Sequence, residues 1–440
     1  MKLEMICTGE EVLAGQIVDT NAAWLGNRLI DAGFEMQRRT TVGDRLSDLV
    51  CVFEERSQHA DIILVNGGLG PTADDLSAQA MAQAMSVELV ENEQWLAVLT
   101  QWFRSRNLEL SASNKKQAMI PKGATVIDNP VGTACGFRVQ FNRAWLFFTP
   151  GVPHEFKQMV DQQFIPFIGS QSDQTCKVTV SKLLTLGMGE SPMAELLESL
   201  SWPQGITLGY RSYMPYLELK LIGRDISESM QQQAVEQAKH ILADTLVAQN
   251  KDTLAEEVHH LLHNSGQSLA IAESLTGGEI SSQLVAFAGS SRYFRHAIVS
   301  YCNAAKMHIL KVQKETLDAQ SEVSLACVAE MAIGTAQLIG EGSQLQYADY
   351  AIATSGMAGP SGGSAKIPIG TVVLAIKAKD KVYCQKIAIS ANRSRAYIRE
   401  LAVAVALDML RRAILLQSPI AQYGYIKSVE QKVFDLSEFN

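Results

Sequence analysis

The sequence predicts an α/β protein with several domains. Short apolar runs alternate with amphipathic stretches over much of the chain, as in proteins whose strands are connected by helices. Glycine-rich segments directly follow several of these runs, which is typical of ligand sites at the ends of parallel strands. The chain has 440 residues, 47% of them hydrophobic and 19% charged, so we expect two to four domains with ample cores.

Charge and cysteine usage exclude several classes of protein. The net charge of −8 and the pI near 5.6 argue against a direct nucleic-acid partner, because such affinity comes from neutralising phosphates. The seven cysteines are scattered and never spaced as C-x-x-C, so neither a disulfide framework nor a zinc site is indicated. Acidic residues come too early for a signal peptide, and the apolar run Leu401–Leu416 is interrupted by Asp408, Arg411 and Arg412. We therefore expect a cytoplasmic protein without a membrane span.

The N-terminal half shows the alternation of elements most clearly. Its apolar runs and amphipathic stretches predict a parallel sheet covered by helices. The expected elements are a strand at Leu3–Thr8, a helix near Thr20–Asp31, a strand near Phe34–Val42, a helix near Asp44–Gln58 and a strand at Ile62–Val65.

The segment N-G-G-L-G-P-T-A-D-D (66–75) follows the last of these strands and leads into a helix. Its glycines permit a close approach of the backbone to a phosphate. Asp74 and Asp75 either hold a divalent cation or cap the helix. Capping is the commoner use of aspartate at this position, so the segment alone does not decide between the two.

This half resembles the N-terminal domain of the CinA family, a relative of the molybdopterin-binding fold of molybdenum-cofactor biosynthesis. The resemblance implies a three-layer α/β/α domain over residues 1–168 that hydrolyses ADP-ribose to AMP and ribose 5-phosphate with a divalent metal. The segments that carry it are T-G-E-E-V-L-A-G-Q-I-V-D-T-N (8–21), T-V-G-D (41–44), G-G-L-G-P-T-A-D-D (67–75), P-K-G-A (121–124), N-P-V-G-T-A (129–134) and P-G-V-P-H-E (150–155).

The same resemblance implies the residues of an ADP-ribose site. Asp75 and Asp74 are the implied metal ligands. An alternative remains open for this half, namely a nucleotide-binding or regulatory module that holds ADP-ribose without hydrolysing it. The implied ADP-ribose-binding residues are Glu11, Asp19, Asn21, Gly67, Gly68, Gly70, Thr72, Asn129, Gly132 and Thr133.

The middle of the chain predicts a small α+β unit over residues 175–250. The small and polar composition of Gly169–Cys176 indicates a linker before it. The unit resembles the connecting domain of the CinA family and carries no recognisable chemistry. Its expected elements are strands at 177–186, 206–213 and 216–222, a helix from Glu190 and a helix over 227–247.

The stretch Leu269–Val285 predicts a strand, a tight turn and a helix. Ser274 lies in the turn, where free N–H groups and the helix dipole favour an anion, so it is either a nucleophile or a helix cap together with Thr276. Ala297–Lys306 repeats the pattern, with Asn303 as the expected cap, and Thr354–Val372 is a glycine-rich loop. We expect the three strand ends to meet at one crevice.

Residues 253–418 resemble the CinA C-terminal domain, a nicotinamide mononucleotide amidohydrolase of the PncC type. The resemblance implies an α/β/α domain that deamidates nicotinamide mononucleotide to nicotinic acid mononucleotide and ammonia, without a cofactor. It also implies Ser274 as nucleophile, Lys306 as its base and Tyr301 as a hydroxyl partner. The matching segments are A-E-S-L-T-G-G (272–278), A-G-S-S (288–291), V-S-Y-C-N-A-A-K (299–306), V-S (323–324), E-M-A-I-G (330–334) and S-G-M-A-G-P-S-G-G-S (355–364).

These residue types suit amide hydrolysis, because a desolvated lysine can take the proton of a serine hydroxyl. The oxyanion donors are expected in either the 276–278 turn or the 355–364 loop. For the substrate phosphate we prefer Arg399 and then Arg395, although a solvated helix face explains either arginine equally well. The implied substrate-binding residues are Thr276, Gly277, Gly278, Ser355, Gly356, Gly359, Gly362, Gly363, Arg395 and Arg399.

Two functional classes stay open. The first is a bifunctional hydrolase of pyridine-nucleotide salvage, and the second is a nucleotide-binding scaffold linked to competence or DNA damage. The family resemblance further implies a homodimer. His259, His260 and His263 lack the H-E-x-x-H pattern and are interpreted as structural, and the tail 419–440 is unassigned.

Overall fold

The computed structural model describes residues 1–171, 178–337 and 347–439. The chain divides into two compact units, residues 1–179 and 180–440, and each is described by itself. Most of the expected linker at Gly169–Cys176 lies outside the described residues, and Gly169 still belongs to a helix.

Unit 1 is built on a six-stranded sheet with strand order β2-β1-β3-β8-β7-β6. Its first four strands are parallel, and the last two are added antiparallel to β8 and β7. The carboxyl ends of β1, β3 and β8 therefore meet at one edge of the sheet. The strands are β1 Leu3–Thr8, β2 Met36–Val42, β3 Ile62–Asn66, β6 Thr125–Ile127, β7 Gly136–Phe141 and β8 Ala144–Thr149.

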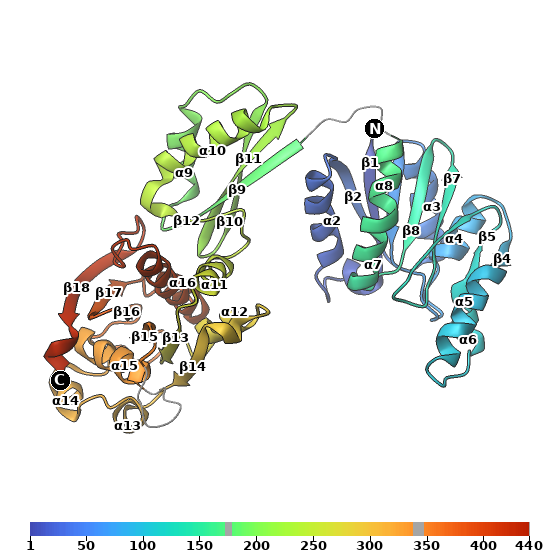
Figure 1. The fold of residues 1–440 in the computed structure, drawn as a ribbon. Coiled ribbons are helices and arrows are strands. Elements are labelled where there is room, and N and C mark those ends of the chain that lie inside the picture. The colour runs from blue at the N-terminus through green and yellow to red at the C-terminus, as the bar shows by residue number, and fades with distance from the viewer. Residues whose placement is uncertain (172–177, 338–346, 440) are drawn as a thin grey trace. The chain divides into compact units, whose positions relative to one another are not determined.

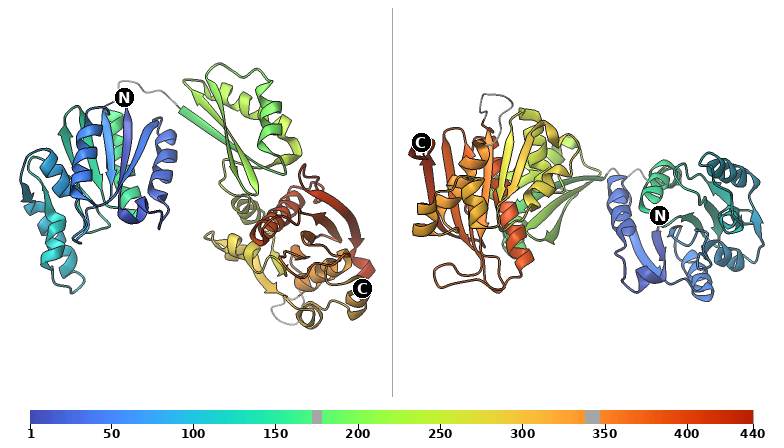
Figure 2. Two further views of the ribbon diagram at one scale, coloured as in Figure 1. Left: turned by 180° about the vertical axis from the view of Figure 1, so that it is seen from behind. Right: turned by 90° about the horizontal axis from the view of Figure 1, so that it is seen from below.

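Helices cover both faces of this sheet, so unit 1 has three α/β/α layers (Figures 1 and 2). One face packs against α2 (Thr20–Asp31), α7 (Pro153–Met159) and α8 (Ile165–Ser170). The other face packs against helices that follow the sheet strands and a small β4–β5 ribbon. These elements are α3 Leu46–Ser57, α4 Ser77–Ala84, β4 Leu89–Glu91, α5 Glu93–Arg104 and β5 Met119–Pro121, and the short helices are α1 Glu10–Leu13 and α6 Ala112–Lys115.

Unit 2 begins with a four-stranded sheet of order β10-β11-β9-β12, which packs against two helices. The expected helix over 227–247 ends early, because the backbone turns at Ala243 with a positive φ of 42° and the next residues pair with β9 as a strand. The elements are β9 Val178–Leu186, α9 Glu190–Glu198, β10 Ile206–Tyr213, β11 Tyr216–Arg224, α10 Glu228–Leu242 and β12 Leu246–Gln249.

The rest of unit 2 is a six-stranded sheet with order β14-β13-β15-β16-β17-β18. Strand β13 is parallel to both of its neighbours, and β15 to β18 are successively antiparallel. The strands are β13 Leu269–Glu273, β14 Phe294–Val299, β15 Tyr350–Gly356, β16 Thr371–Ala378, β17 Lys381–Ala388 and β18 Lys427–Asp435.

This sheet also lies between helical layers (Figure 1). Helix α15 covers one face, and α11, α12 and α16 cover the other, where the core includes Leu184 and Val247 of the small sheet. The helices are α11 Leu254–Ser265, α12 Glu279–Val285, α13 Asn303–His308, α14 Lys314–Gln320, α15 Leu325–Gln337 and α16 Arg395–Ile414. The predicted α/β class, with its small α+β part, is thus confirmed.

The tail that the sequence leaves unassigned supplies the edge strand β18, which pairs with β17. Ahead of it, the buried Tyr423 donates its hydroxyl to Asp408 of α16 at 2.8 Å. Asp408 is fully buried and also pairs with Arg411 and Arg412 of the same helix, and Arg412 reaches the carbonyl of Asp244. Within the described ranges no helix combines the length and the apolar composition that crossing a bilayer requires.

Candidate active sites

In unit 2, the turn between β13 and α12 carries Ser274. The N–H of Ser274 donates to the carbonyl of Thr354 on the neighbouring strand at 3.1 Å, which fixes the start of the turn. Gly277 and Gly278 then both adopt positive φ values, 65° and 95°. Two consecutive residues in this conformation favour glycine strongly, and they turn the chain from the strand into the helix.

Lys306 on α13 lies next to Ser274. Its Nζ is 3.1 Å from Ser274 Oγ and donates to the carbonyl of Ser300 at 2.8 Å. The lysine is 2% exposed, and burial lowers its pKa, although nearby Cys327 and Glu322 oppose that shift. A buried amine with a lowered pKa, in contact with a hydroxyl, can accept its proton.

The side chain that caps α12 is Glu273, which the sequence analysis did not single out. Its carboxylate is fully buried and accepts the N–H groups of Gly278, Ile280 and Ser281 at 2.9, 3.2 and 3.0 Å, together with the Ser281 hydroxyl at 2.6 Å. The capping interpretation of Ser274 and Thr276 is therefore wrong, since the N-cap residue is Gly278. Asn303 is likewise not a cap, because α13 has Cys302 at that position without a side-chain bond.

Two arginines of α16 bind the loops around Ser274. Arg399 donates from Nε to the carbonyl of Leu275 at 3.1 Å and from Nη2 to that of Thr276 at 2.7 Å. Arg395 donates to the carbonyl of Gly359 and to the hydroxyl of Tyr301, both at 2.7 Å. Arg399 is partly buried and Arg395 is exposed. Arg399 therefore holds the nucleophile turn, and Arg395 joins the glycine-rich loop to Tyr301.

The other expected substrate-binding residues divide into two groups. The Thr276 hydroxyl is buried against that of Thr354 at 2.8 Å, and the Ser355 hydroxyl donates to the carbonyl of Glu322 at 2.7 Å, so both are engaged within the protein. Gly356 ends β15, and the loop after it contains Gly359, Gly362 and Gly363.

The backbone donors of the nucleophile turn are only partly used. The N–H of Gly277 donates to the carbonyl of Ser274, and that of Gly278 donates to Glu273. The N–H groups of Leu275 and Thr276 have no acceptor within the described residues. Because the C=O and N–H of a trans peptide point in opposite directions, the bond from Arg399 to the Leu275 carbonyl aims the Thr276 N–H away from the arginine.

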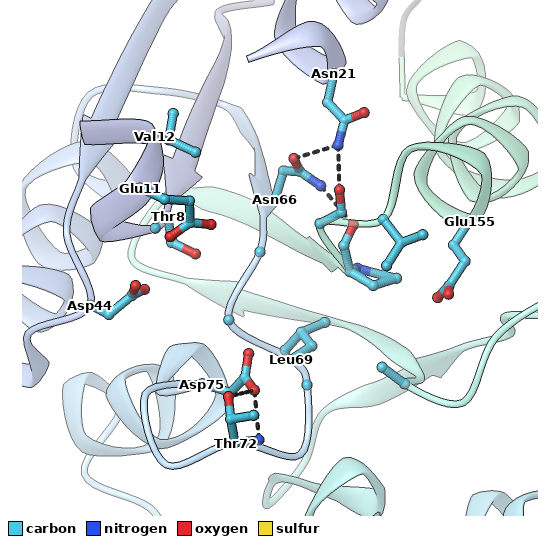
Figure 3. Close-up of a pocket in the computed structure, with 18 of the residues that line it drawn as sticks. Thr8, Glu11, Val12, Asn21, Asp44, Asn66, Leu69, Thr72, Asp75 and Glu155 are labelled. Atoms are coloured by element: carbon cyan, nitrogen blue, oxygen red, sulfur yellow. Dashed lines mark hydrogen bonds between the residues drawn. The ribbon is translucent and has the colours of Figure 1, made fainter. Parts of the chain in front are cut away.

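In unit 1, a cavity of about 580 Å³ opens where β1, β3 and β8 end (Figure 3). Gly67 lies between two of these strand ends with a φ of 110°, and a Cβ there would be 2.6 Å from Thr8 Oγ1, so only glycine fits. Of the residues expected here, the cavity is lined by Glu11, Asp19, Asn21, Gly67, Gly68, Gly70, Thr72, Asp74, Asp75 and Thr133.

Asn129 and Gly132 do not line this cavity. Asn129 is buried and donates to Glu155 at 2.7 Å and to the carbonyl of Ala134 at 2.8 Å, so it supports the wall from behind. A Cβ on Gly132 would be 2.1 Å from the same carboxylate, which explains the glycine. Glu155 itself does line the cavity, and the segment P-G-V-P-H-E that contains it was the available signal.

Three polar atoms at this cavity have no hydrogen-bond partner in the described part of the chain: Thr8 Oγ1, Asp19 Oδ2 and Asn21 Oδ1. Thr8 and Asn21 are only 6% and 5% exposed. The amide nitrogen of Asn21 donates to Asn66 and to the carbonyl of Gly151, at 3.0 and 2.8 Å, so its oxygen is held as a free acceptor (Figure 3). Buried polar groups are normally paired, so these atoms are placed to bond a water molecule or a polar ligand in the cavity.

Several carboxylates line the cavity. Glu11, Asp44 and Asp75 surround it (Figure 3), and burial together with the charges of Glu11, Asp74 and Asp75 raises the pKa of Asp44. The sequence analysis missed Asp44, although it ends the segment T-V-G-D. Asp75 accepts the N–H and the hydroxyl of Thr72 at 2.8 and 2.5 Å and does not cap α4, whose N-cap is Leu76.

These oxygen donors are of the kind that Mg²⁺ or Ca²⁺ prefers. Within residues 1–171, 178–337 and 347–439, however, no three His, Cys, Asp or Glu side chains lie close enough together to hold a metal ion. The donors fit a cation that takes one or two carboxylates and completes its shell with phosphate oxygens and water, as Mg²⁺ commonly does.

The histidines of α11 have protein partners. His259 Nδ1 is 3.0 Å from the hydroxyl of Tyr293, and its ring stacks on Phe287 at 5.0 Å. His263 Nε2 is 3.1 Å from an Arg292 nitrogen. Burial lowers the pKa of His259, which keeps this ring neutral within the core.

Known proteins resemble this chain over nearly its full length. Residues 251–414 match the family described as "CinA C-terminal domain", and residues 4–170 match that described as "Probable molybdopterin binding domain". A CinA-like protein of Shewanella sediminis is 56% identical over 96% of this chain and 98% of its own length, and one of Shewanella halifaxensis is 54% identical over 98% and 100%. A crystal structure of CinA from Thermoplasma acidophilum, described as having unknown function, matches with 31% identity over 37% of this chain and 97% of its own, at a TM-score of 0.35.

Proposed function

Because this chain belongs to the family of CinA-like proteins, we propose that its C-terminal domain is an amidohydrolase that converts nicotinamide mononucleotide to nicotinic acid mononucleotide and ammonia. The observation that carries the proposal is the contact of 3.1 Å between Lys306 Nζ and Ser274 Oγ. A serine hydroxyl in contact with a buried amine meets the requirement of nucleophilic catalysis for an adjacent base, and it needs no metal.

In the proposed mechanism, Ser274 Oγ bonds to the carboxamide carbon while Lys306 takes the hydroxyl proton. Lys306 then gives this proton to the departing nitrogen, and ammonia leaves an ester on Ser274. A water molecule bonds to the ester carbon as Lys306 takes its proton, and the carbon–oxygen bond to the serine breaks. The released product is the carboxylic acid, and the proton returns to Ser274.

The oxyanion of both steps needs donors that are fixed in advance. We assign this role to the N–H groups of Leu275 and Thr276, since they are adjacent to the nucleophile and lack acceptors among the described residues. Arg399 fixes the same turn by holding the carbonyls of Leu275 and Thr276. Removing one such donor typically costs about a hundredfold to a thousandfold in rate.

For the substrate phosphate, the geometry reverses the order expected from the sequence. Arg399 already directs Nε and Nη2 at backbone carbonyls, whereas Arg395 is exposed beside Tyr301 and the glycine-rich loop. We therefore propose Arg395 as the phosphate ligand and Arg399 as a positioning residue. Tyr301, 61% exposed and 2.7 Å from Arg395, is proposed to orient that arginine.

Ammonia release from the purified full chain tests the amidohydrolase. With nicotinamide mononucleotide as substrate, Ser274→Ala should lose at least about a thousandfold in rate, because the covalent route is removed. Ser282→Ala on the exposed side of α12 is the matched control and should retain the wild-type rate. Equal release from both variants would contradict the proposal.

We propose a second activity for unit 1, the metal-dependent hydrolysis of ADP-ribose to AMP and ribose 5-phosphate. The three orphan acceptors at the cavity favour it, because ribose hydroxyls can donate to Thr8, Asp19 and Asn21. Asp75 is proposed to hold the cation together with phosphate oxygens, and Asp44 is the further carboxylate at the cavity. When bound, a divalent cation would neutralise the diphosphate and lower the pKa of a water molecule.

Asp44 also lines the cavity, and we propose it as the carboxylate that would accept a proton from a water molecule there. Gly67, Gly68, Gly70 and Thr72 are proposed to approach the diphosphate. We further propose a cytoplasmic homodimer whose substrates are free nucleotides. A scaffold that binds ADP-ribose without turnover is the alternative, and it predicts binding without AMP production.

A further inference from the structure

Unit 2 contains a cavity of about 320 Å³ that is separate from Ser274 and Lys306. It lies between the β10–β11 turn, the start of α9, the segment that leads from β17 into α16, and Tyr425 and Ile426 near the C-terminus. Leu217, Leu401 and Ile426 are buried residues of its lining. Its size is at the lower end for small-molecule sites, so it suits a ligand of about mononucleotide size.

Three tyrosines supply the walls of this cavity: Tyr216, Tyr397 and Tyr425. Arg393 already lies over the ring of Tyr397, with Cζ 4.8 Å from the ring centroid, so this aromatic face accepts a cation. Tyrosine is uncharged at neutral pH, and burial raises the pKa of Tyr425 further, to about 12. Groups of uncharged aromatic rings recognise cations such as quaternary ammonium groups.

The charged groups at the mouth of the cavity have opposite signs. Glu190, at the start of α9, is exposed and adds a carboxylate that favours a positive group. Arg393 is also exposed and offers a guanidinium suited to a phosphate, with the Ser390 hydroxyl beside it among the lining residues. A ligand that is complementary to both Glu190 and Arg393 carries a cationic ring and an anionic group.

We propose that this cavity binds a mononucleotide with a positively charged aromatic ring, its ring beside Tyr216 and Tyr425 and its phosphate at Arg393, which stays over Tyr397. A pyridinium nucleotide has this chemistry, because the ring nitrogen bonded to ribose is positively charged. The site goes beyond the proposed amidohydrolase, and it does not depend on turnover at Ser274. Tyr397 belongs to the first turns of α16, the helix that also carries Arg395 and Arg399, so a ligand here contacts the helix that holds the nucleophile turn.

The test uses the full chain with Ser274→Ala, which keeps nicotinamide mononucleotide intact during the measurement. Hydrogen exchange of the segments 212–217 and 425–426 should slow when this nucleotide is added, since they carry the lining residues Ser212, Met214, Tyr216, Leu217, Tyr425 and Ile426 and lie outside the Ser274 turn. AMP, whose ring is neutral, and nicotinamide riboside, which has no phosphate, should each bind at least about tenfold more weakly.

Adding Arg393→Ala should weaken the protection of residues 212–217 about tenfold, whereas Arg295→Ala, an exposed arginine of β14, should leave it unchanged. The melting temperature of each variant shows whether it has folded. Unchanged exchange with millimolar nicotinamide mononucleotide, or equal protection by AMP, would overturn the proposal. Failure of the amidohydrolase would appear separately, as absence of ammonia release from the wild-type chain.

Discussion

The two candidate active sites differ in how complete they are in the chain alone. At Ser274 the side chains proposed for the reaction are already in contact: the nucleophile touches its base, Glu273 is saturated with donors, and Arg399 holds the turn. The N–H groups of Leu275 and Thr276 and the Ser300 hydroxyl have no partner among the described residues. At the unit 1 cavity, Thr8, Asp19 and Asn21 have atoms without a protein partner, and burial together with neighbouring carboxylates raises the pKa of Asp44. The first site is preorganised by contacts within the chain, whereas the second exposes unpaired acceptors and carboxylates to its cavity.

This difference follows from the chemistry proposed for each site. Attack by a serine needs a fixed base and fixed N–H donors, which a protein can provide by itself. Hydrolysis of a diphosphate requires neutralisation of several negative charges. Carboxylates are themselves negative, so they contribute only by holding a cation that neutralises the diphosphate. Ammonia release and AMP production should therefore respond to different perturbations.

The largest expected effect is the loss of the base at the preorganised site. Lys306→Met keeps the length of the side chain but cannot take a proton, so ammonia release should fall at least about a thousandfold. AMP production from ADP-ribose by the same preparation should be unchanged. If the variant retained more than a tenth of the wild-type rate of ammonia release, Lys306 would not be the base, and its contact with Ser274 would have no catalytic role.

The next effect belongs to the site that needs a cation. Dialysis against EDTA should abolish AMP production and leave ammonia release intact, and added Mg²⁺ or Mn²⁺ should restore AMP production. Asp75→Ala should lower AMP production about a hundredfold at saturating metal. Glu91→Ala, outside the cavity, serves as control. Full activity in EDTA would contradict the metal dependence.

A smaller effect should follow from loosening the preorganised turn. Glu273→Gln keeps the shape but replaces one acceptor oxygen by a donor that faces backbone N–H groups, so kcat should fall about tenfold with little change in KM. The melting temperature should also decrease by a few degrees. Glu279→Gln, in the first turn of the same helix, should change neither value. A change in KM alone would indicate that Glu273 supports binding rather than positioning.

The smallest effect concerns the pH dependence of stability. Burial lowers the pKa of Lys306 below its usual value, so the unfolded chain binds the proton more tightly than the folded chain. Between the lowered pKa and the usual one, the free energy of unfolding of the wild type should rise with pH relative to Lys306→Met. Urea unfolding of both proteins at several pH values measures this difference. A difference that did not change with pH would show that the amine stays charged when folded.

Local sequence patterns predicted β1 and β3 of unit 1 well, because each is a short apolar run between clear turn residues. Strand β2 was expected near its observed bounds although its sequence, MQRRTTV, is mostly polar and none of its residues is buried, and β8 was not among the expected strands. Local patterns did not predict strands that form only because they pair with a strand distant in the sequence. Residues Leu246–Gln249 continue a helical pattern but pair with β9, and β18 has a single buried residue, Phe434, so it shows no strand alternation. Such elements depend on a neighbouring strand that a local pattern does not contain.

Local patterns likewise predicted only those site residues that belong to a clear motif. Ser274 and Lys306 could be predicted because each follows an apolar run within a specific motif, and the parallel strands bring them together. The contacts of Arg399 with Leu275 and Thr276 join residues more than a hundred positions apart, and sequence alone suggested a phosphate instead. Asp44 was missed because one aspartate before a helix looks like an ordinary cap.

The C-terminal strand has a practical consequence for anyone who shortens this chain. Removing residues after Ser418 would deprive Asp408 of the Tyr423 hydroxyl and would uncover the hydrogen-bonding edge of β17. Open edges of this kind recruit strands from other molecules, and the mixed charges Lys427, Glu430 and Lys432 on β18 discourage that recruitment. A fragment cut at this point should therefore aggregate, even though every residue proposed for catalysis would still be present.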